Sequence, residues 1–216
     1  MTASDAPPPI EYDVFAAFDA EPMARLLGDV FSRRDPPAFA VGLTAAEFEA
    51  FVRALCPRAA AERLTIVARL AGTGELVGAL LTQDAATDAF DGVEALSPRF
   101  APILDIIGQL EPEDQYEPPA PGVSLHLLLL GVADSVSGRG VAQRLVRECI
   151  ERGSKCGYRV AVTEATNPVS QRVFRKLGFV ERTRRSYGEY RFEGRAVFSS
   201  IAELGGPMLM ERSLTG

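Results

Sequence analysis

The sequence predicts a single α/β domain, and its length, its composition and the periodicity of its apolar residues all favour that class. The chain has 216 residues, which is enough for one sizeable domain. It is 47% hydrophobic and 24% charged, as expected for a globular protein with a core. Segments with strand periodicity alternate with segments of helical periodicity, and no internal repeat interrupts them. We therefore expect a flexible tail at 1–10 and one domain over 11–216.

The first elements follow from local signals. Residues 12–18 are compatible with a strand, and 21–31 place apolar side chains at helical spacing. The consecutive prolines that follow should end this helix, because proline lacks the backbone N–H and fixes φ. Thr44 and Glu47 then form a capping box, which predicts a helix from there to about Leu55, just before Pro57.

A hairpin and a long irregular segment come next. Residues 64–70 and 76–82 read as two strands joined by a glycine turn. The segment 84–122 mixes a helical stretch at 99–110 with an acidic, proline-rich end. Long irregular segments in compact domains are usually functional or disordered, so we interpret 84–122 as an insertion or lid over one end of the sheet.

The patterns that predict strands and helices are clearest in the last ninety or so residues. Residues 125–132 form a continuous apolar strand, and 141–152 form a strongly amphipathic helix after a glycine turn. Another strand at 159–165 leads to Asn167, which should cap a helix that has Pro168 at its first position. Two or three further strands, with a turn at 193–194, should complete the sheet.

The glycine turn predicts an anion site. Unpaired amides at a helix N-terminus and the positive end of the helix dipole attract anions, and glycines let a bulky phosphate approach the backbone. The residues that would cradle a pyrophosphate are Gly138, Arg139, Gly140, Val141 and Ala142. The sequence has no GxxxxGK followed by Ser or Thr, so it is not a P-loop. A dinucleotide-binding turn needs a third glycine where this chain has Gln143.

These residues resemble the acetyl-CoA motif of the GNAT superfamily of N-acetyltransferases. The motif reads R/Q-x-x-G-x-G/A after an apolar strand: Gly140 and Ala142 match its last positions, whereas Ser137 departs from the first. Residues 167–179, which end in Lys-Leu-Gly-Phe, resemble the helix that follows in the family. The resemblance covers 123–179 well and the rest by layout. It implies a GNAT fold, with a mixed, mostly antiparallel sheet splayed between strands 4 and 5 and helices on both faces.

The resemblance also implies acetyl-CoA as the co-substrate, with its pantetheine arm in the gap between the splayed strands. The residues it assigns to the coenzyme are Leu130, Gly131, Val132, Ser137, Gly138, Arg139, Gly140, Val141, Ala142, Asn167 and Ser170. A backbone N–H near Val132 would stabilise the developing oxyanion. Arg144 could add charge, or it could be an ordinary surface arginine.

Within the superfamily the layout is most similar to the arylalkylamine and dopamine N-acetyltransferase branch. Residues 31–37 resemble an early segment of that branch, but the catalytic glutamate of the segment falls at Pro36. Thr166 and Ser170 match two hydroxyls that the branch uses near the thioester. The absent glutamate puts the mechanism and substrates of the branch in question for this chain.

Three residues are candidates for catalysis. His126 interrupts an apolar strand at an offset where another branch has its catalytic glutamate, so we favour it as the base, although it could equally be a core histidine. Glu164 is the second candidate base, or a surface carboxylate. The usual acid of the family is a tyrosine where this chain has Phe174. Tyr187 is therefore a candidate acid, and the alternatives are Tyr190, Ser170 or no dedicated residue.

The composition argues against several classes of binding partner. A net charge of −6 argues against general nucleic-acid binding and is compatible with cationic acceptors such as amines. His126 is the only histidine and the three cysteines have no metal-binding spacing, so no metal is expected. No signal peptide or membrane-length apolar run occurs, so we expect a cytoplasmic monomer or homodimer without membrane contact.

Three functions are compatible with these residues. The first is acetyl transfer from acetyl-CoA to the primary amine of a small molecule, by direct attack in a ternary complex. The second is acetylation of a protein terminus or lysine. The third is a non-catalytic acyl-CoA-binding module, which the proline at 36 and the phenylalanine at 174 keep open.

Overall fold

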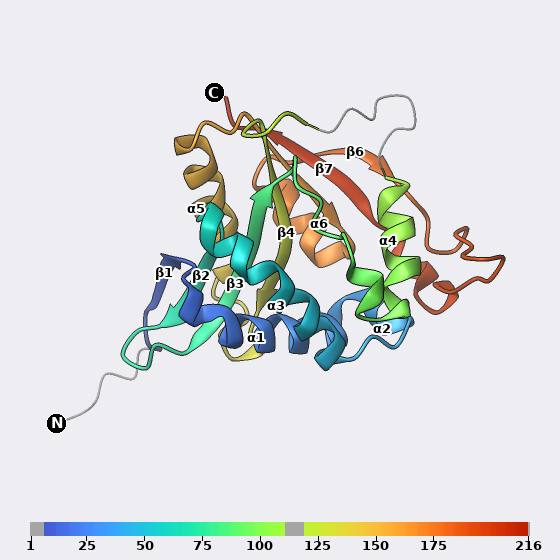
Figure 1. The fold of residues 1–216 in the computed structure, drawn as a ribbon, viewed down its shortest axis with the longest axis horizontal. Helices are drawn as coiled ribbons and strands as arrows, with labels where there is room; N and C mark the ends of the chain where they lie inside the picture. Colours follow the sequence, from blue (N-terminus) through green and yellow to red (C-terminus); the bar gives the residue numbers. More distant parts are fainter. Residues whose placement is uncertain (1–6, 111–118, 216) are drawn as a thin grey trace.

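The computed structural model describes residues 7–110 and 119–215. Its centre is a seven-stranded sheet with the order β1-β2-β3-β4-β5-β7-β6 (Figure 1). Neighbouring strands are antiparallel except β4 and β5, which are parallel. The strands are β1 (Ile10–Val14), β2 (Ile66–Leu70), β3 (Leu76–Asp84), β4 (Ser124–Val132), β5 (Val160–Ala165), β6 (Val180–Arg184) and β7 (Met208–Ser213). The predicted mixed, mostly antiparallel sheet is confirmed.

Helices cover both faces of the sheet, as predicted. The helices α1 (Ala20–Arg34) and α3 (Ala45–Glu62) cross in front of β2, β3 and β4 in Figure 1. They build one apolar core with the short helices α2 (Pro36–Ala40) and α4 (Ala101–Gly108). The helices α5 (Val141–Lys155) and α6 (Pro168–Lys176) build a second core on the opposite face, around Leu145 and Phe174.

The parallel pair β4–β5 comes apart soon after it begins. Ser124 to His126 pair with Val160 to Val162, and the two strands diverge beyond that point. A β-bulge lies next to the divergence: Leu81 of β3 pairs with Leu129 and Thr82 pairs with Leu127, which leaves Leu128 without a partner in β3. Bulges bend a strand and locally disrupt its ladder. The splay predicted between strands 4 and 5 is thus confirmed.

The N-terminus differs from expectation. The first strand spans Ile10–Val14, not 12–18, because the chain leaves the sheet at Phe15 and enters a 3-10 turn at Ala17–Asp19. Asp19 stabilises that turn, since its carboxylate accepts the Ala16 N–H at 3.0 Å and pairs with Arg69. The expected tail is also shorter than 1–10, because Ile10 already pairs with Leu70, while residues 1–6 lie outside the described residues.

The predicted end of α3 is wrong. The helix begins after Thr44, with the predicted capping box, but continues through Pro57 to Glu62 and ends at Arg63, whose φ is 57°. A proline inside a helix removes one backbone hydrogen bond and costs about 3 kcal/mol. Burial of the apolar face of α3 offsets this cost, because side chains on both sides of the proline are buried, namely Phe48, Phe51, Val52, Leu55, Cys56 and Ala59.

The segment 84–122 forms two short 3-10 helices, Val93–Ala95 and Pro98–Phe100, followed by α4. The predicted helix at 99–110 is thus confirmed in its central part. The acidic segment 111–117 lies outside the described residues. A turn at 193–194 has positive φ at both residues, 47° and 77°, as the sequence indicated.

Candidate active site

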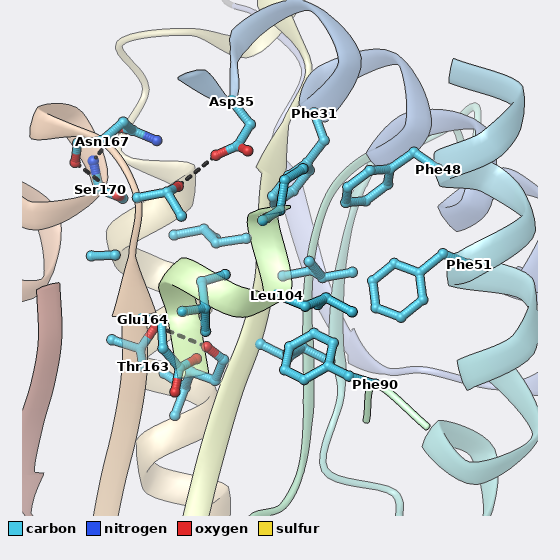
Figure 2. A pocket seen from close by; sticks show the side chains of 18 of the residues that line it. Phe31, Asp35, Phe48, Phe51, Phe90, Leu104, Thr163, Glu164, Asn167 and Ser170 are labelled. Atoms are coloured by element: carbon cyan, nitrogen blue, oxygen red, sulfur yellow. Dashed lines mark hydrogen bonds between the residues drawn. The ribbon is translucent and has the colours of Figure 1, made fainter. Parts of the chain in front are cut away.

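The diverging strands open into a pocket between β4 and β5 on one side and α1, α3 and α4 on the other. Residues 127–130 of β4 and 163–167 around the end of β5 line it. The opposite wall is aromatic and consists of Phe31, Phe48, Phe51, Phe90 and Phe100, next to the α4 side chains Ile103, Leu104 and Ile107. Figure 2 shows Asp35, Asn167 and Ser170 toward one end of the pocket and Thr163 and Glu164 toward the other.

Asp35 is a site residue that the sequence analysis missed. It caps α2 by accepting the Ala38 N–H at 3.2 Å, and it also accepts a hydrogen bond from the Thr166 hydroxyl (Figure 2). Burial raises the pKa of Asp35 from 3.8 to about 6, against the lowering effect of these two hydrogen bonds. A carboxylate with this pKa can accept a proton near neutral pH. The sequence feature that could have identified Asp35 is an acidic residue directly before a proline at the start of a helix.

Asp35 also changes how residues 31–37 are interpreted. In the resemblance drawn from the sequence, the family's glutamate falls at Pro36, but Pro36 is a buried residue at the start of α2. The carboxylate that reaches the pocket belongs to the preceding residue. The pocket therefore has an acid where the sequence indicated none.

Residues at the start of α6 form the same end of the pocket. Asn167 caps the helix, because its side-chain oxygen accepts the N–H groups of Val169 and Ser170 at 3.0 and 2.8 Å. The Ser170 hydroxyl donates to the Asn167 carbonyl at 2.9 Å. Thr166, Asn167 and Ser170 all line the pocket, so the structure brings these sequence-predicted positions together beside Asp35.

The two candidate bases contact each other. His126 Nε2 and Glu164 Oε2 lie 2.7 Å apart, and both side chains are largely buried. Because an ionised carboxylate only accepts, Nε2 carries the proton in this contact. Burial raises the pKa of Glu164, but the charge and the hydrogen bond of His126 outweigh it, so the pKa lies below its ordinary value. Glu164 lines the pocket and is not a surface carboxylate.

The aromatic candidates for the acid are structural neighbours of the pocket. Tyr187 is fully buried, and its hydroxyl donates to the Thr166 carbonyl at 2.7 Å. Burial, and then the charge of Asp35, raise the pKa of Tyr187 well above its ordinary value. The Tyr190 hydroxyl donates to Asp105 at 2.6 Å. Phe174 lines the pocket where the family usually has its tyrosine.

The glycine turn leaves the amides at the start of α5 available for an anion, whereas the Arg139 N–H donates to the Val136 carbonyl at 3.3 Å. The hydrogen-bonded ladder of α5 begins with the Arg144 N–H and the Gly140 carbonyl, so the amides of residues 141–143 precede it. Gly140 is the N-cap, has a φ of 75°, and receives no side-chain cap. Gly138 has a φ of 76°, a conformation in which glycine is favoured. Residues 138–142 therefore fit an oxyanion at the helix start.

The remaining predicted coenzyme residues are placed less directly. Leu130 lines the pocket, whereas Gly131 and Val132 pair with Ala79 and Gly78 of β3. The Val132 carbonyl accepts a hydrogen bond from Arg34 at 2.8 Å. Ser137 is exposed and ends the 3-10 turn Asp134–Val136.

The two arginines near the turn have partners in the protein. Arg139 donates to the Pro8 carbonyl at 2.6 Å. Arg144 pairs with Glu148 at 2.6 Å and lies over the ring of Tyr12. Main-chain amides, more than arginine side chains, thus define this anion site.

A helix N-terminus with uncapped amides favours a bound anion, and here that helix follows β4, the strand that separates from β5. Residues 43–179 match the acetyltransferase (GNAT) family, and the chain belongs to that family. It is therefore an enzyme of the N-acetyltransferase class, as the two sequence motifs indicated.

Solved structures share this fold. A putative arylalkylamine N-acetyltransferase 7 from the yellow fever mosquito Aedes aegypti has 24% identity and a TM-score of 0.77, covering 95% of this chain and 87% of its own. The C-terminal condensation domain of Ebony, in complex with beta-alanyl-dopamine, has 14% identity and a TM-score of 0.78, with coverages of 95% and 99%. A Drosophila melanogaster polyamine N-acetyltransferase that forms N-acetylagmatine has 16% identity and a TM-score of 0.72, with coverages of 95% and 100%.

Residues 7–110 and 119–215 contain neither a metal-binding cluster nor a helix that could cross a membrane. No group of three or more histidine, cysteine, aspartate or glutamate side chains in that part of the chain is arranged to hold a metal ion. No helix there combines the length and apolar character that crossing a bilayer requires.

Proposed function

We propose that this enzyme transfers the acetyl group of acetyl-CoA to the primary amine of a small molecule, by direct attack in a ternary complex. One observation carries the proposal: a single pocket is lined by the diverging ends of β4 and β5 and also by the aromatic side chains of α1 and α3. A donor between the strands and an acceptor against the aromatic wall would meet there. Holding both reactants in one site makes the reaction effectively unimolecular.

The donor would bind through main-chain groups. The amides at 138–142, other than that of Arg139, would hold the diphosphate of the coenzyme, and its pantetheine arm would run between β4 and β5. Leu128 is our candidate for the oxyanion donor, in place of a residue near Val132, because the bulge leaves Leu128 without a partner in β3. A backbone N–H aimed at a developing oxyanion is a strong catalytic device.

Asp35 would serve as the general base. An alkylamine has a pKa near ~10.4, so about one molecule in a thousand is neutral at pH 7, and the proton has to be removed. Asp35 lines the pocket and has a pKa of about 6. Glu164 also lines the pocket, but its hydrogen bond with His126 favours the ionised carboxylate and leaves it a weaker base.

The leaving thiolate makes a smaller demand. Its pKa near ~8.5, by analogy with cysteine, requires only modest help from an acid. Tyr187 is held by the Thr166 carbonyl and does not line the pocket, so its contribution would be to position the Thr166 segment.

The aromatic wall supports a small apolar amine as the acceptor. Phenylalanine rings provide dispersion contacts to an aryl or alkyl body, and the carboxylates of Asp35 and Glu164 attract its ammonium group. A peptide would need an open groove with backbone partners. The arylalkylamine and polyamine N-acetyltransferases among the similar structures are in line with a small acceptor.

Calorimetry with acetyl-CoA, followed by a thiol-release screen over arylalkylamines, polyamines and a lysine peptide, tests the proposal. We expect binding of acetyl-CoA and turnover with at least one small amine. Asp35→Asn and His126→Ala are measured beside the wild type to assign the base. Binding of acetyl-CoA with no thiol release from any amine would contradict the proposal and favour a non-catalytic acyl-CoA-binding module.

A further inference from the structure

A second cavity lies behind the aromatic wall of the active-site pocket. It runs between α3 and residues 87–96 of the segment after β3, and its apolar lining includes Ala54, Leu55, Val93 and Leu96. Phe51 lines this cavity and also lines the active-site pocket, so its side chain belongs to the wall between them.

The ring of Phe51 is held firmly in this wall. It is 3% exposed and packs against Phe90 in a stacked geometry, with 6.1 Å between ring centroids. Phe100 meets it edge-on at 5.4 Å, and Phe48 at 5.7 Å. Figure 2 shows Phe51 reaching from its helix toward Leu104 on the other side of the pocket. Aromatic pairs of this kind add stability beyond the area they bury, so the wall stays closed.

The second cavity has apolar and polar lining residues, and the polar ones are Arg58, Thr87, Asp88 and Asp91. Arg58 donates to the Asp88 carbonyl at 3.2 Å, and the Asp88 side chain accepts the Phe90 N–H at 2.8 Å. These bonds attach residues 87–96 to α3 and to the wall itself. Arg58 and the Asp88 carboxylate therefore already have protein partners, and the apolar side chains of the lining are left to contact the hydrocarbon part of a ligand.

We propose that Phe51 sets the upper limit on the length of the acceptor amine by closing the active-site pocket off from this second cavity. The inference rests on the proposed function, since it names the size class of the acceptor. With Phe51 in place, an amine with one aromatic ring fits, and an amine with a second ring behind the first is excluded. Removing the ring joins the two cavities and admits the longer amine.

The test compares phenethylamine with biphenyl-ethylamine as acceptors, with acetyl-CoA as the donor, in wild type, Phe51→Ala and Phe51→Leu. We expect the ratio of kcat/KM for the long amine over the short one to rise by about tenfold or more in Phe51→Ala, and by less in Phe51→Leu. Thermal melting identifies a variant that fails to fold, and Phe51→Leu, which retains more apolar volume, is the safeguard against that outcome.

A second substitution shows whether the extra ring enters the far cavity. Ala54 is exposed and lines only that cavity, so Ala54→Trp fills it from the outside. The double variant Phe51→Ala/Ala54→Trp should lose the gain for the long amine, while Ala54→Trp alone should turn over phenethylamine like the wild type. A gain that survives Ala54→Trp would overturn the proposal.

Direct titration of both amines separates this inference from the proposed function. If the wild type acetylates no amine, the proposed function fails, yet calorimetry still measures which amine each variant binds. An unchanged preference between the two amines in folded Phe51→Ala and Phe51→Leu, in turnover or in binding, would overturn the assignment of Phe51.

Discussion

His126 and Glu164 form a buried pair whose nitrogen and oxygen lie 2.7 Å apart, on two strands that separate immediately beyond them. His126 pairs with Val162 at the last paired position of β4 and β5, and Glu164 follows on β5. The pair thus stands at the point where the sheet opens. The charge of His126 also holds the pKa of Glu164 below its ordinary value, despite burial.

Breaking this pair should destabilise the protein. His126→Ala leaves the Glu164 carboxylate buried without its charged partner, which costs about 3–5 kcal/mol in comparable cases. His126→Ala/Glu164→Gln removes the uncompensated charge and should recover about 1–2 kcal/mol of that loss. Urea denaturation near pH 7 measures both variants.

The same variants separate a structural role from a catalytic one. A double variant no more stable than His126→Ala would show that the uncompensated charge of Glu164 is not the cause of the loss. Loss of turnover in folded His126→Ala, beyond the loss in Glu164→Gln, would favour His126 as the base. Unchanged turnover would remove His126 from the mechanism.

Asp35→Asn should abolish the proton-accepting step. General bases contribute about a hundredfold to ten-thousandfold, so kcat/KM should fall within that range. The wild-type profile should rise with pH through about 6, where Asp35 loses its proton, and the variant should lack this rise. Thiol release measured across the pH range tests this. Glu164→Gln, which neutralises the other carboxylate of the pocket, should keep the rise, and an Asp35→Asn profile like the wild type would contradict the assignment.

Asp35 should also make the stability of the fold depend on pH, in the direction opposite to that of activity. The folded pKa of Asp35 is raised from 3.8 to about 6, so its favourable contribution is complete below pH 3.8 and is lost as the pH rises to about 6. At neutral pH this loss amounts to about 3 kcal/mol of the free energy of unfolding. Asp35→Asn should therefore flatten the stability curve between those pH values. Denaturant midpoints at several pH values measure it, and a slope equal to that of the wild type would contradict burial as the cause.

Gly140→Ala should weaken acetyl-CoA binding. Gly140 has a φ of 75°, which costs an L-residue about 1–2 kcal/mol, and a Cβ there would lie 3.4 Å from the Gln143 side chain. Relaxation would shift the amides that precede the α5 ladder, so we expect the Kd for acetyl-CoA to rise about tenfold.

Gly157→Ala is the matched control, because Gly157 has a φ of 93° and open space around its Cβ direction, at the opposite end of α5. It should lose comparable stability and keep acetyl-CoA affinity in calorimetry. Equal affinity losses in both variants would argue that the turn at 138–142 does not hold the diphosphate.

Tyr187→Phe tests the expectation that Tyr187 acts as the acid. The structure favours a positioning role, since its hydroxyl donates to the Thr166 carbonyl and Thr166 in turn donates to Asp35. We expect a stability loss of about 1–2 kcal/mol and a shift of the acidic limb of the pH–rate profile. If Tyr187 were the general acid, Tyr187→Phe would instead lose much of its kcat. An acetyl donor whose thiol is more acidic would then restore part of that kcat.

Local signals in the sequence predicted many of the elements correctly. Thr44 and Asn167 cap helices as expected, because an N-cap depends on residues only two or three positions away. The glycine turn before α5 was found for the same reason, since positive φ and a free helix N-terminus are local properties. The helix continues through Pro57, where the sequence predicted its end, because burial of the whole helix face outweighs the local break. That burial is a tertiary effect.

By itself, the sequence determined most of the strands and helices along the chain, the glycine turn before α5 and the family, since each depends on neighbouring residues or on a motif. Only the tertiary structure decided which acids share a pocket: it brings Asp35 to Thr166, across 131 positions, and His126 to Glu164. It also raised the pKa of Asp35, because burial is a property of the packed chain. Aspartate before proline has the same local sequence whether it faces water or a pocket, and packing alone separates the two.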